Sequence, residues 1–314
     1  MKPLVSVVVP LCNEAGSLAQ LHAELRHVMD TFAQPYELIY VDDGSTDGTI
    51  EILKTLTGSI ILCLARNYGQ STALDAGFRA AKGEIIVSLD GDGQNDPRDI
   101  PKLLERLTDP EIDVAAGWRT ERKDPKSIRI ITSAARNLRG WIIGDHIHDS
   151  GCTLRAYRRT AIESIDLFGE MHRFLLALLI WKGFRVVEVP VHHRERTAGE
   201  SKYNSGKAVR GFIDLLYIWF LYRYSERPLH LFGYMGLASF ALGIVSFCIT
   251  LHDKLQLHIH LNRDGWFFLT FFFLLTGIML FSFGLVIDLL MRIHTNTSAR
   301  EKRYYVRRTF TAGA

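Results

Sequence analysis

The fold of this chain is decided by one stretch of its sequence, Glu84-Ile85-Ile86-Val87-Ser88-Leu89-Asp90-Gly91-Asp92-Gly93-Gln94-Asn95-Asp96-Pro97. The apolar first half has the composition of a buried strand. Two carboxylates separated by a single residue follow it, with glycines that allow a tight turn. Asp96 before Pro97 is typical of an N-cap and a first helical position. The stretch therefore predicts a strand, an acidic turn and a new helix.

The acidic turn has two interpretations. In an open α/β sheet the ligand lies in a crevice beyond the carboxyl ends of the strands, and Asp90 and Asp92 stand at such an end. Two carboxylates there suit Mg²⁺ or Mn²⁺ that is held together with substrate phosphates. A solvated acidic loop is the alternative, and an isolated Asp-x-Asp motif does not distinguish the two.

Strands and helices are expected to alternate along the amino-terminal two thirds of the chain. The expected strands are 4–9, 37–41, 59–65, 84–89, 113–118 and 185–193, and the expected helices are 15–32, 70–81 and 127–143. This alternation predicts a doubly wound, mostly parallel sheet. The loops after its first, second and fourth strands share one edge, so we expect Asn13-Glu14, Asp42-Asp43 and Asp90-Asp92 to converge there.

Composition and motifs exclude several classes of protein. The net charge of +3 over 314 residues is too small to indicate nucleic-acid binding. The four cysteines form no CxxC pair, which argues against a zinc site or a disulfide framework. The sequence has no GxxxxGK[ST] P-loop, and Gly91-Asp92-Gly93 lacks the third glycine of a dinucleotide fingerprint. The apolar run 5–10 is too short for a signal peptide, so we expect none.

Two long uncharged runs predict membrane spans. Residues 229–251 and 266–287 contain no Asp, Glu, Lys or Arg, and each run is long enough to cross a bilayer as a helix. Basic residues flank the pair, so the positive-inside rule places both ends and the amino-terminal domain in the cytoplasm. Residues 207–224 have a basic start and an aromatic face, which favours a helix on the membrane surface over the alternative of a core helix.

The sequence therefore predicts four parts. A cytoplasmic catalytic domain is expected over residues 1–206, and an interfacial amphipathic helix over 207–227. A transmembrane hairpin is expected over 228–292, with spans at about 229–251 and 266–290. A basic cytoplasmic tail, 293–314, would contact the anionic leaflet. The expected location is the cell inner membrane, as a multi-pass protein.

Several motifs, taken in order along the chain, resemble glycosyltransferase family 2. They are Val9-Pro10-Leu11-Cys12-Asn13-Glu14, Val41-Asp42-Asp43-Gly44-Ser45-Thr46-Asp47-Gly48-Thr49 and the acidic turn Asp90 to Pro97. Three more are Arg66-Asn67-Tyr68-Gly69-Gln70, Gly151-Cys152-x-Leu154-Arg155-Ala156-Tyr157-Arg158 and Arg196-x-x-Gly-x-Ser201-Lys202-Tyr203. With two spans behind them, these motifs resemble the polyprenyl-phosphate glycosyltransferases, relatives of dolichyl-phosphate mannose synthase. The resemblance covers residues 4 to about 290 and implies the GT-A fold, a Rossmann-like α/β architecture.

The resemblance also implies roles for residues on the donor side. The nucleotide pocket would be lined by Pro10, Asn13, Glu14 and Asp42, with Asp43 and Asn67 beside them and Asp90 at its diphosphate end. The metal ion and the donor diphosphate would be held by Asp90, Asp92 and Gln94. Gly91 stands where many relatives have alanine, and we expect it to loosen the loop slightly. His172 and Arg173 resemble a motif near the sugar pocket, with structural packing as the alternative.

The residues that would bind the acceptor can be predicted from the charge of the lipid phosphate. A lipid phosphate is already an anion at neutral pH, so it can attack the anomeric carbon without a general base. The enzyme then needs cations that hold the phosphate, and arginine suits phosphate best. Candidates that match the family or precede the membrane helix are Arg119, Arg129, Ser133, Arg136, Arg194, Arg196, Ser201 and Lys202. Ordinary solvated charges are the alternative for each of them.

Three residues are predicted to act in catalysis beside the acidic turn. Arg119 follows the fifth strand, and Arg136 shares a helical face with Arg129 and Ser133. Ala134 stands where relatives often have an arginine, and Arg136 would take over its role. Asp149 is expected to face the sugar or the metal ion, and a turn-forming aspartate is its alternative.

The sequence thus predicts an inverting glycosyltransferase that uses Mg²⁺ or Mn²⁺. It would move a hexose from a nucleotide diphosphate sugar to a polyprenyl phosphate, undecaprenyl or dolichyl, for a cell envelope glycan. UDP-sugars are the first expectation for the donor, and GDP-mannose is the alternative. Further expected partners are the membrane, a second copy of the chain, and a downstream flippase or membrane glycosyltransferase.

Two other classes remain as alternatives. A processive polysaccharide synthase would carry a QxxRW motif and more spans than this chain has. An inactive relative that serves as a membrane scaffold would not need the intact Asp90, Asp92 and Gln94.

Overall fold

The structure is a computed structural model, and it describes most of the chain. The described residues are 4–32, 34–120, 140, 147–167, 169–194, 213, 216–217, 219–220, 223–224, 227–256, 260–261 and 264–297. They belong to two compact units that divide near residue 214.

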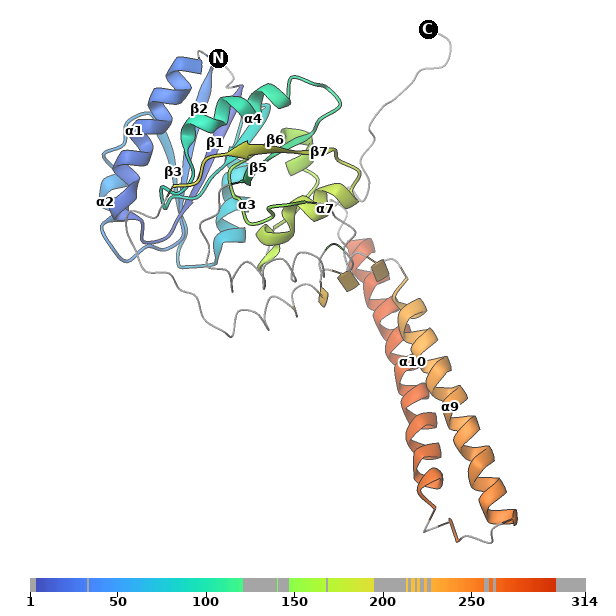
Figure 1. The fold of residues 1–314 in the computed structure, drawn as a ribbon. Helices are drawn as coiled ribbons and strands as arrows, with labels where there is room; N and C mark the ends of the chain where they lie inside the picture. The colour runs from blue at the N-terminus through green and yellow to red at the C-terminus, as the bar shows by residue number, and fades with distance from the viewer. Residues whose placement is uncertain are drawn as a thin grey trace. The chain divides into compact units, whose positions relative to one another are not determined.

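Within the described residues, the first unit is built on a sheet of seven strands (Figure 1). The strands are β1 (Val5–Leu11), β2 (Tyr36–Asp42), β3 (Ser59–Cys63), β4 (Ile85–Ser88), β5 (Val114–Arg119), β6 (Arg155–Arg158) and β7 (Val186–Val191). Their spatial order is β3-β2-β1-β4-β6-β5-β7. Only β6 runs antiparallel to its neighbours in this described sheet, so the predicted mostly parallel sheet is confirmed.

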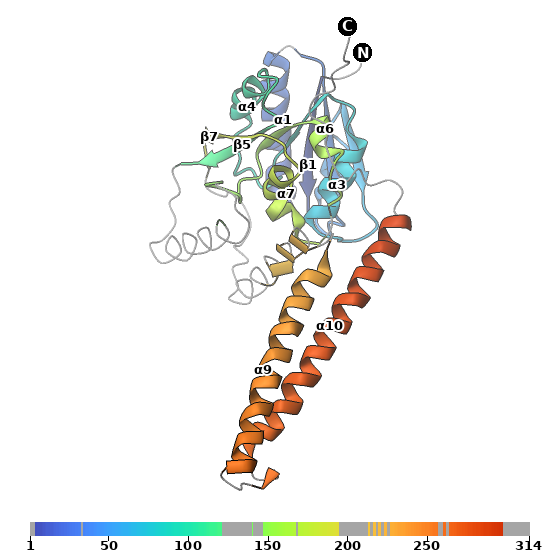
Figure 2. The same cartoon turned by 90° about the vertical axis from the view of Figure 1, so that its right-hand side faces the viewer.

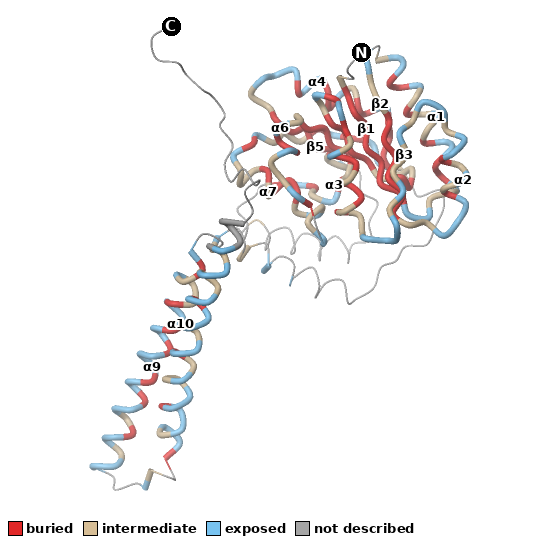
Figure 3. The backbone as a smooth tube through the Cα atoms, turned by 180° about the vertical axis from the view of Figure 1, so that it is seen from behind, coloured by how far each residue is buried: buried red, intermediate tan, exposed pale blue. Residues whose placement is uncertain are grey.

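Helices cover both faces of the sheet (Figure 2). One face packs against α1 (Ala15–Phe32), α2 (Thr49–Leu53) and α4 (Ile100–Arg106), and the other against α3 (Gln70–Ala80), α6 (Arg159–Ile162) and α7 (Leu175–Trp181). Successive side chains of a strand point to opposite faces, so Val7 and Val9 enter the first core and Val8 the second. Figure 3 shows the sheet as the buried layer between the helices.

The acidic turn leads into a short 3₁₀ helix, η1 (Pro97–Asp99), as its sequence predicts. The Asp96 side chain caps this helix by accepting a hydrogen bond from the Arg98 backbone N–H at 3.0 Å, and Pro97 is the first helical residue. A second 3₁₀ helix, η2 (Met171–Phe174), precedes α7. The capping prediction is therefore confirmed.

Among the strands of the described sheet, β6 is the one that the sequence did not predict. It has four residues, Arg-Ala-Tyr-Arg, and its two arginines hide the apolar pattern of a strand. Arg155 is nevertheless buried, because its guanidinium donates to the backbone oxygens of Cys152 and Ser150 at 2.7 Å each. These contacts hold the loop before β6 and allow a charged residue inside the sheet.

Two predicted helices lie largely outside the described residues. Of the helix expected over 127–143, only Gly140 is described, and it is helical. Of the interfacial helix expected over 207–224, residues 213, 216–217, 219–220 and 223–224 are described, and all are helical.

The second unit contains two long antiparallel helices, α9 (Pro228–Gln256) and α10 (Gly265–Thr297). Both are long and apolar enough to cross a membrane. Small residues let them approach closely: a Cβ on Gly236 would lie 2.9 Å from the Gly277 carbonyl oxygen. Ser239 and Ser246 donate hydrogen bonds across the pair to the carbonyl oxygens of Phe273 and Trp266, each at 2.8 Å. Many large apolar residues of both helices are exposed, as lipid contact requires, and exposed residues run along both helices in Figure 3.

Candidate active site

A cavity of about 260 Å³ lies at the carboxyl edge of the sheet. Its wall combines the end of β1 and the start of α3 with the segments that follow β1, β2, β3 and β4. The predicted convergence of the loops after the first, second and fourth strands is thus confirmed. The predicted site residues in the wall are Pro10, Glu14, Asp43, Asn67, Asp90 and Asp92.

The two carboxylates of the acidic turn face the same cavity. Asp90 Oδ1 accepts a hydrogen bond from Gln70 Nε2 at 2.7 Å, and Asp92 Oδ1 accepts one from the Gln94 backbone N–H at 3.1 Å. Burial, together with the negative charge of Asp92, raises the pKa of Asp90 to about 6. The two carboxylates therefore repel each other, and a cation between them would relieve that repulsion.

The carboxylate oxygens of Asp90 and Asp92 suit a divalent cation that also binds the substrate. In the described part of the chain, no group of three or more His, Cys, Asp and Glu side chains could hold a metal ion. Mg²⁺, however, is often bound by one or two carboxylates together with substrate phosphates and water. Asp90 and Asp92 supply such a pair at the cavity wall. Gln94 contributes its backbone N–H to Asp92 and is not part of the wall.

Gly91 lets the acidic turn pack tightly on β1. A Cβ at this position would lie 2.2 Å from Leu11 Cδ2 and 3.3 Å from the Pro10 carbonyl oxygen. The Gly91 carbonyl oxygen accepts a hydrogen bond from the Ser17 hydroxyl at 2.7 Å. The expectation that glycine loosens the turn is therefore corrected: its missing side chain makes the close contact with β1 possible.

The other acidic and amide residues of the predicted pocket mainly fix its loops. Asp43 accepts the backbone N–H groups of Tyr68 and Gly69 at 2.7 and 2.8 Å, and it also lines the cavity. Asp42 is fully buried and accepts the Ser45 N–H at 3.3 Å. Asn13 has a positive φ of 61° and accepts the Thr46 N–H at 2.7 Å. Asp42 and Asn13 thus stabilise the loops after β2 and β1, and neither side chain lines the cavity.

Arg119 and Asp149 form a bidentate pair near the acidic turn. Arg119 Nε and Nη2 donate to the two Asp149 oxygens at 2.6 and 2.8 Å, and both side chains are largely buried. Gly151 makes room for the pair, since a Cβ there would lie 3.0 Å from Arg119 Nη2. The Arg119 charge acts on Asp90 and lowers its pKa, although burial and Asp92 outweigh this effect. Asp149 therefore contacts Arg119 and does not line the donor cavity.

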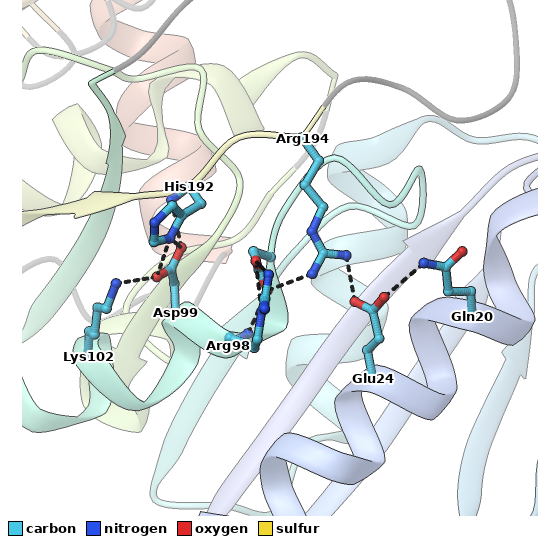
Figure 4. A network of polar contacts seen from close by, with 8 residues as sticks. Gln20, Glu24, Arg98, Asp99, Lys102, His192 and Arg194 are labelled. Carbon is cyan, nitrogen blue, oxygen red and sulfur yellow. Dashed lines mark hydrogen bonds and ion pairs between the residues drawn. The ribbon is translucent and has the colours of Figure 1, made fainter.

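Arg194 joins a network of ion pairs between α1, η1 and the end of β7 (Figure 4). Its guanidinium contacts Glu24 at 2.6 Å and Asp96 at 2.8 Å. Burial alone would raise the pKa of Asp96, but hydrogen bonds from Arg98 and Arg194 lower it to about 2. Two carboxylates thus balance the charge of Arg194. Its backbone N–H also donates to the Gln94 carbonyl oxygen, so Arg194 anchors the segment after β7 to the acidic turn.

The remaining acceptor candidates lie outside the described residues: Arg129, Ser133, Arg136, Arg196, Ser201 and Lys202.

His172 packs against the first turn of α3. Its Nδ1 lies 2.8 Å from the Ser71 hydroxyl, which also accepts the His172 backbone N–H at 3.0 Å. Burial, together with the nearby Arg173, lowers the pKa of His172 to about 4, so the imidazole is neutral at pH 7. Arg173 pairs with Glu170 at 3.0 Å and is exposed. The packing alternative for His172 agrees with these contacts.

Sequence reasoning missed two polar residues that act on Asp90. Gln70 is the first residue of α3 and donates a hydrogen bond to Asp90, and the Thr153 hydroxyl, in the loop before β6, lowers the Asp90 pKa. Gln70 belongs to a motif that resembles the family and Thr153 stands at an unspecified position of another, but neither residue type alone signals a partner. A polar side chain at the start of a helix that faces a predicted crevice is the signal that could have identified Gln70.

The mixed sheet and the acidic cavity at its carboxyl edge define a domain of the GT-A class of glycosyltransferases. Glycosyl transferase family 2 matches residues 6–166, and the chain belongs to this family.

Two curated relatives are similar over nearly the whole chain. The dodecaprenyl-phosphate galacturonate synthase of Rhizobium johnstonii is 36% identical, with 98% of this chain and 93% of the relative covered. The undecaprenyl-phosphate 4-deoxy-4-formamido-L-arabinose transferase of Aeromonas hydrophila is 33% identical, with 96% and 93% covered.

Solved structures show the same fold. Glucosyl-3-phosphoglycerate synthase from Mycobacterium tuberculosis, in complex with Mn²⁺, UDP and phosphoglyceric acid, has a TM-score of 0.54 and 21% identity, covering 69% of this chain and 78% of that chain. The same enzyme in complex with Mg²⁺ and UDP has a TM-score of 0.54 and 20% identity, covering 69% and 79%.

Proposed function

We propose that the protein transfers a sugar from a nucleotide diphosphate sugar to a polyprenyl phosphate at a membrane surface. The convergence of Asp90 and Asp92 with Pro10, Glu14 and Asn67 in one cavity carries the donor half of this proposal. The acceptor half is supported by two relatives whose names state transfer to dodecaprenyl or undecaprenyl phosphate. The two apolar helices of the second unit fit a lipid acceptor.

On the donor side, Asp90 and Asp92 would hold the divalent cation, Mg²⁺ or Mn²⁺, beside the diphosphate. When bound, such a cation neutralises negative charge on the leaving nucleoside diphosphate. Pro10, Glu14 and Asn67 would surround the nucleotide, and Asp43 keeps the segment after β3 in place through two backbone N–H groups. The role of this side of the site is to bind and orient the donor.

On the acceptor side, a phosphate oxygen of the lipid forms the new bond to the anomeric carbon. The bond from that carbon to the diphosphate oxygen breaks, and its electron pair leaves with the nucleoside diphosphate. Attack from the opposite face inverts the configuration, and no proton has to be removed because the phosphate is already an anion. Asp149 is therefore free to serve Arg119 instead of acting as a base.

Arg119 is our candidate for contact with the acceptor phosphate. A guanidinium has five N–H donors, and Asp149 takes two of them, so three remain for an anion. Asp149 fixes the plane of the guanidinium, which is the arrangement that bidentate phosphate binding uses. Arg136 and Arg196 are proposed from the sequence as further contacts.

For the donor we favour a UDP-sugar, with GDP-mannose as the alternative. We infer that the catalytic unit lies on the cytoplasmic side of the cell inner membrane. Association with a second copy, and transfer of the product to a flippase or membrane glycosyltransferase, remain predictions from the sequence.

The test is a transfer assay with the purified full chain in detergent. UDP-sugars and GDP-mannose are titrated in parallel against one polyprenyl phosphate, with Mg²⁺ or Mn²⁺, and the glycosylated lipid is measured together with the released nucleotide. We expect one donor to give a lipid-linked sugar in a metal-dependent reaction. Binding of the lipid without transfer from any donor would favour the inactive scaffold.

A further inference from the structure

Gln70 links the start of α3 to the acidic turn. Its Nε2 donates a hydrogen bond to Asp90 Oδ1 at 2.7 Å, and Gln70, Asp90 and Asp92 line the same cavity. The two bonded residues are 20 positions apart and belong to different segments, so only the fold brings them together. Gln70 therefore contacts one of the two carboxylates that would hold the cation.

The groups that act on Asp90 from this side are neutral. The Gln70 amide donates a hydrogen bond to it, and the Thr153 hydroxyl is close enough to lower its pKa. Thr153 Oγ1 accepts a hydrogen bond from Asn95 Nδ2 at 2.9 Å. Neutral donors fix a carboxylate without cancelling its charge, whereas an arginine or lysine in the same place would compete with a cation.

The nearby arginines have their partners outside the cavity wall. Arg119 pairs with Asp149, and Arg155 donates to two backbone carbonyl oxygens. Neither of them lines the cavity, so Asp90 and Asp92 present negative charge to it.

The position of Gln70 is set by a firmly packed helix. Asp43 accepts the N–H groups of Tyr68 and Gly69 immediately before it, and Ser71 immediately after it bonds His172. Farther along α3, Gly77 allows close approach to the sheet, because a Cβ there would lie 2.3 Å from Val8 Cγ1. The amide of Gln70 is thus delivered to Asp90 from a fixed backbone.

We propose that Gln70 is a positioning residue for the divalent cation: its amide holds the Asp90 carboxylate in the orientation in which Asp90 and Asp92 bind the cation together. This inference rests on the proposed function, since the cation is the one that accompanies the donor diphosphate. Gln70 acts through Asp90 and touches neither the cation nor the sugar. Loss of an outer partner of this kind weakens metal binding by about 10- to 100-fold.

The experiment compares Gln70→Met with a matched control, Gln20→Met. Gln20 Nε2 also donates to a carboxylate, Glu24, at 2.9 Å, but both residues lie on α1 and neither lines the cavity (Figure 4). Both substitutions replace an amide with an apolar chain of similar length. Mn²⁺ is titrated into the full chain in detergent and free Mn²⁺ is measured by electron paramagnetic resonance, with UDP and, in a parallel series, GDP. No acceptor is added, so there is no turnover.

We expect Gln70→Met to weaken Mn²⁺ binding by about 10- to 100-fold and Gln20→Met to leave it unchanged. In transfer assays of Gln70→Met, the Mn²⁺ concentration that gives half-maximal rate should rise by the same factor as the Mn²⁺ dissociation constant. The KM for polyprenyl phosphate should not change. Melting temperatures check the fold, and Gln70→Ala is used if the Met variant is destabilised.

Three outcomes would overturn the inference. The first is equal Mn²⁺ affinity in Gln70→Met and the wild type, and the second is equal weakening in the Gln20→Met control. The third is sugar transfer by a wild type that binds no Mn²⁺ with either nucleotide; this outcome leaves the proposed transfer intact. A wild type that neither binds Mn²⁺ nor transfers any sugar would instead overturn the proposed function, and the inference with it.

Discussion

Asp90 and Asp92 lie in the same cavity, yet their surroundings differ. The Asp90 side chain accepts a hydrogen bond from the Gln70 amide, whereas Asp92 accepts one from the backbone of its own turn. Burial raises the pKa of Asp90 to about 6, and the negative charge of Asp92 adds to the rise. Removing either charge should therefore affect both cation binding and the stability of the turn.

Asp92→Asn keeps the size of the side chain and removes one negative charge. We expect metal-dependent transfer to fall by about 100-fold or more, because charge on the leaving diphosphate is no longer balanced. The melting temperature without added metal should stay the same or rise, since repulsion with Asp90 disappears. Transfer rates and thermal melting of the full chain check both expectations. Full activity in this variant would remove Asp92 from the site.

His172 makes the stability of the fold depend on pH. Its pKa is lowered from 6.5 to about 4, mainly by burial, so below pH 6.5 the unfolded chain takes up a proton that the folded chain does not. The contribution of neutral His172 is complete above about pH 6.5 and is lost as the pH falls toward 4. At pH 5 the loss is about 2 kcal/mol.

His172→Gln should therefore flatten the fall in melting temperature between pH 7 and pH 5. Ser71→Ala is the companion variant, since it removes the hydroxyl but keeps the histidine, and it should retain the steep fall. An equal pH dependence in His172→Gln and the wild type would contradict the assigned protonation state.

Adjacent acidic residues show the limit of sequence reasoning at this scale. Asp42 and Asp43 carry the same side chain and both are buried, but of the two it is Asp43 that lines the cavity. The sequence placed both in the nucleotide pocket. Which one lines it depends on where β2 ends and the chain turns, and this is decided by packing against the segment after β3.

At the scale of elements, the contact between α9 and α10 depends on small residues. Gly236 and Gly277 face each other so closely that a Cβ on either would lie 2.9 Å from the carbonyl oxygen of the other. Helices in lipid associate through such packing and through hydrogen bonds like those of Ser239 and Ser246. The sequence predicts the two spans from their missing charges, but it does not reveal which faces meet.

Gly236→Ala should destabilise the hairpin, because the new methyl group collides with backbone atoms. The matched control is Gly233→Ala in the same helix, where the nearest atom to a new Cβ is Leu229 Cδ1 at 4.0 Å. We expect a loss of about 1–3 kcal/mol for Gly236→Ala and no loss for Gly233→Ala. Thermal melting in detergent measures both. Equal stability of the two variants would argue against the close helix contact.

Strand β6 likewise could not be predicted from its own sequence. Its short, arginine-ended sequence carries no strand pattern, and yet it separates β4 from β5 in the middle of the sheet. The loop before it supplies Asp149 and Thr153, which contact Arg119 and Asp90. An element that is invisible in the sequence thus organises the side of the cavity where the acceptor is expected.

At the scale of the whole molecule, orientation in the membrane is the main expectation that follows from charge. The amino-terminal unit and both ends of the chain are predicted to be cytoplasmic, with the short connection between α9 and α10 on the other side. Cys12 and Cys63 are exposed thiols of the first unit, and His260 is an exposed residue of the connection.

In intact spheroplasts, a membrane-impermeant maleimide should label a His260→Cys variant and leave Cys12 and Cys63 unlabelled until lysis. Mass spectrometry of the labelled protein locates each modified cysteine. Labelling of Cys12 or Cys63 before lysis would reverse the predicted orientation.

The sequence by itself determined the mostly parallel sheet, the capped acidic turn, the two apolar helices and the resemblance to the family. Each of these depends on local patterns: runs of apolar residues, turn residues and the absence of charge over a bilayer's length. The tertiary structure alone decided which residues meet: Gln70 with Asp90, Asp149 with Arg119, and Arg194 with Glu24 and Asp96. These pairs join distant segments, so they depend on strand order and register, which no local pattern specifies.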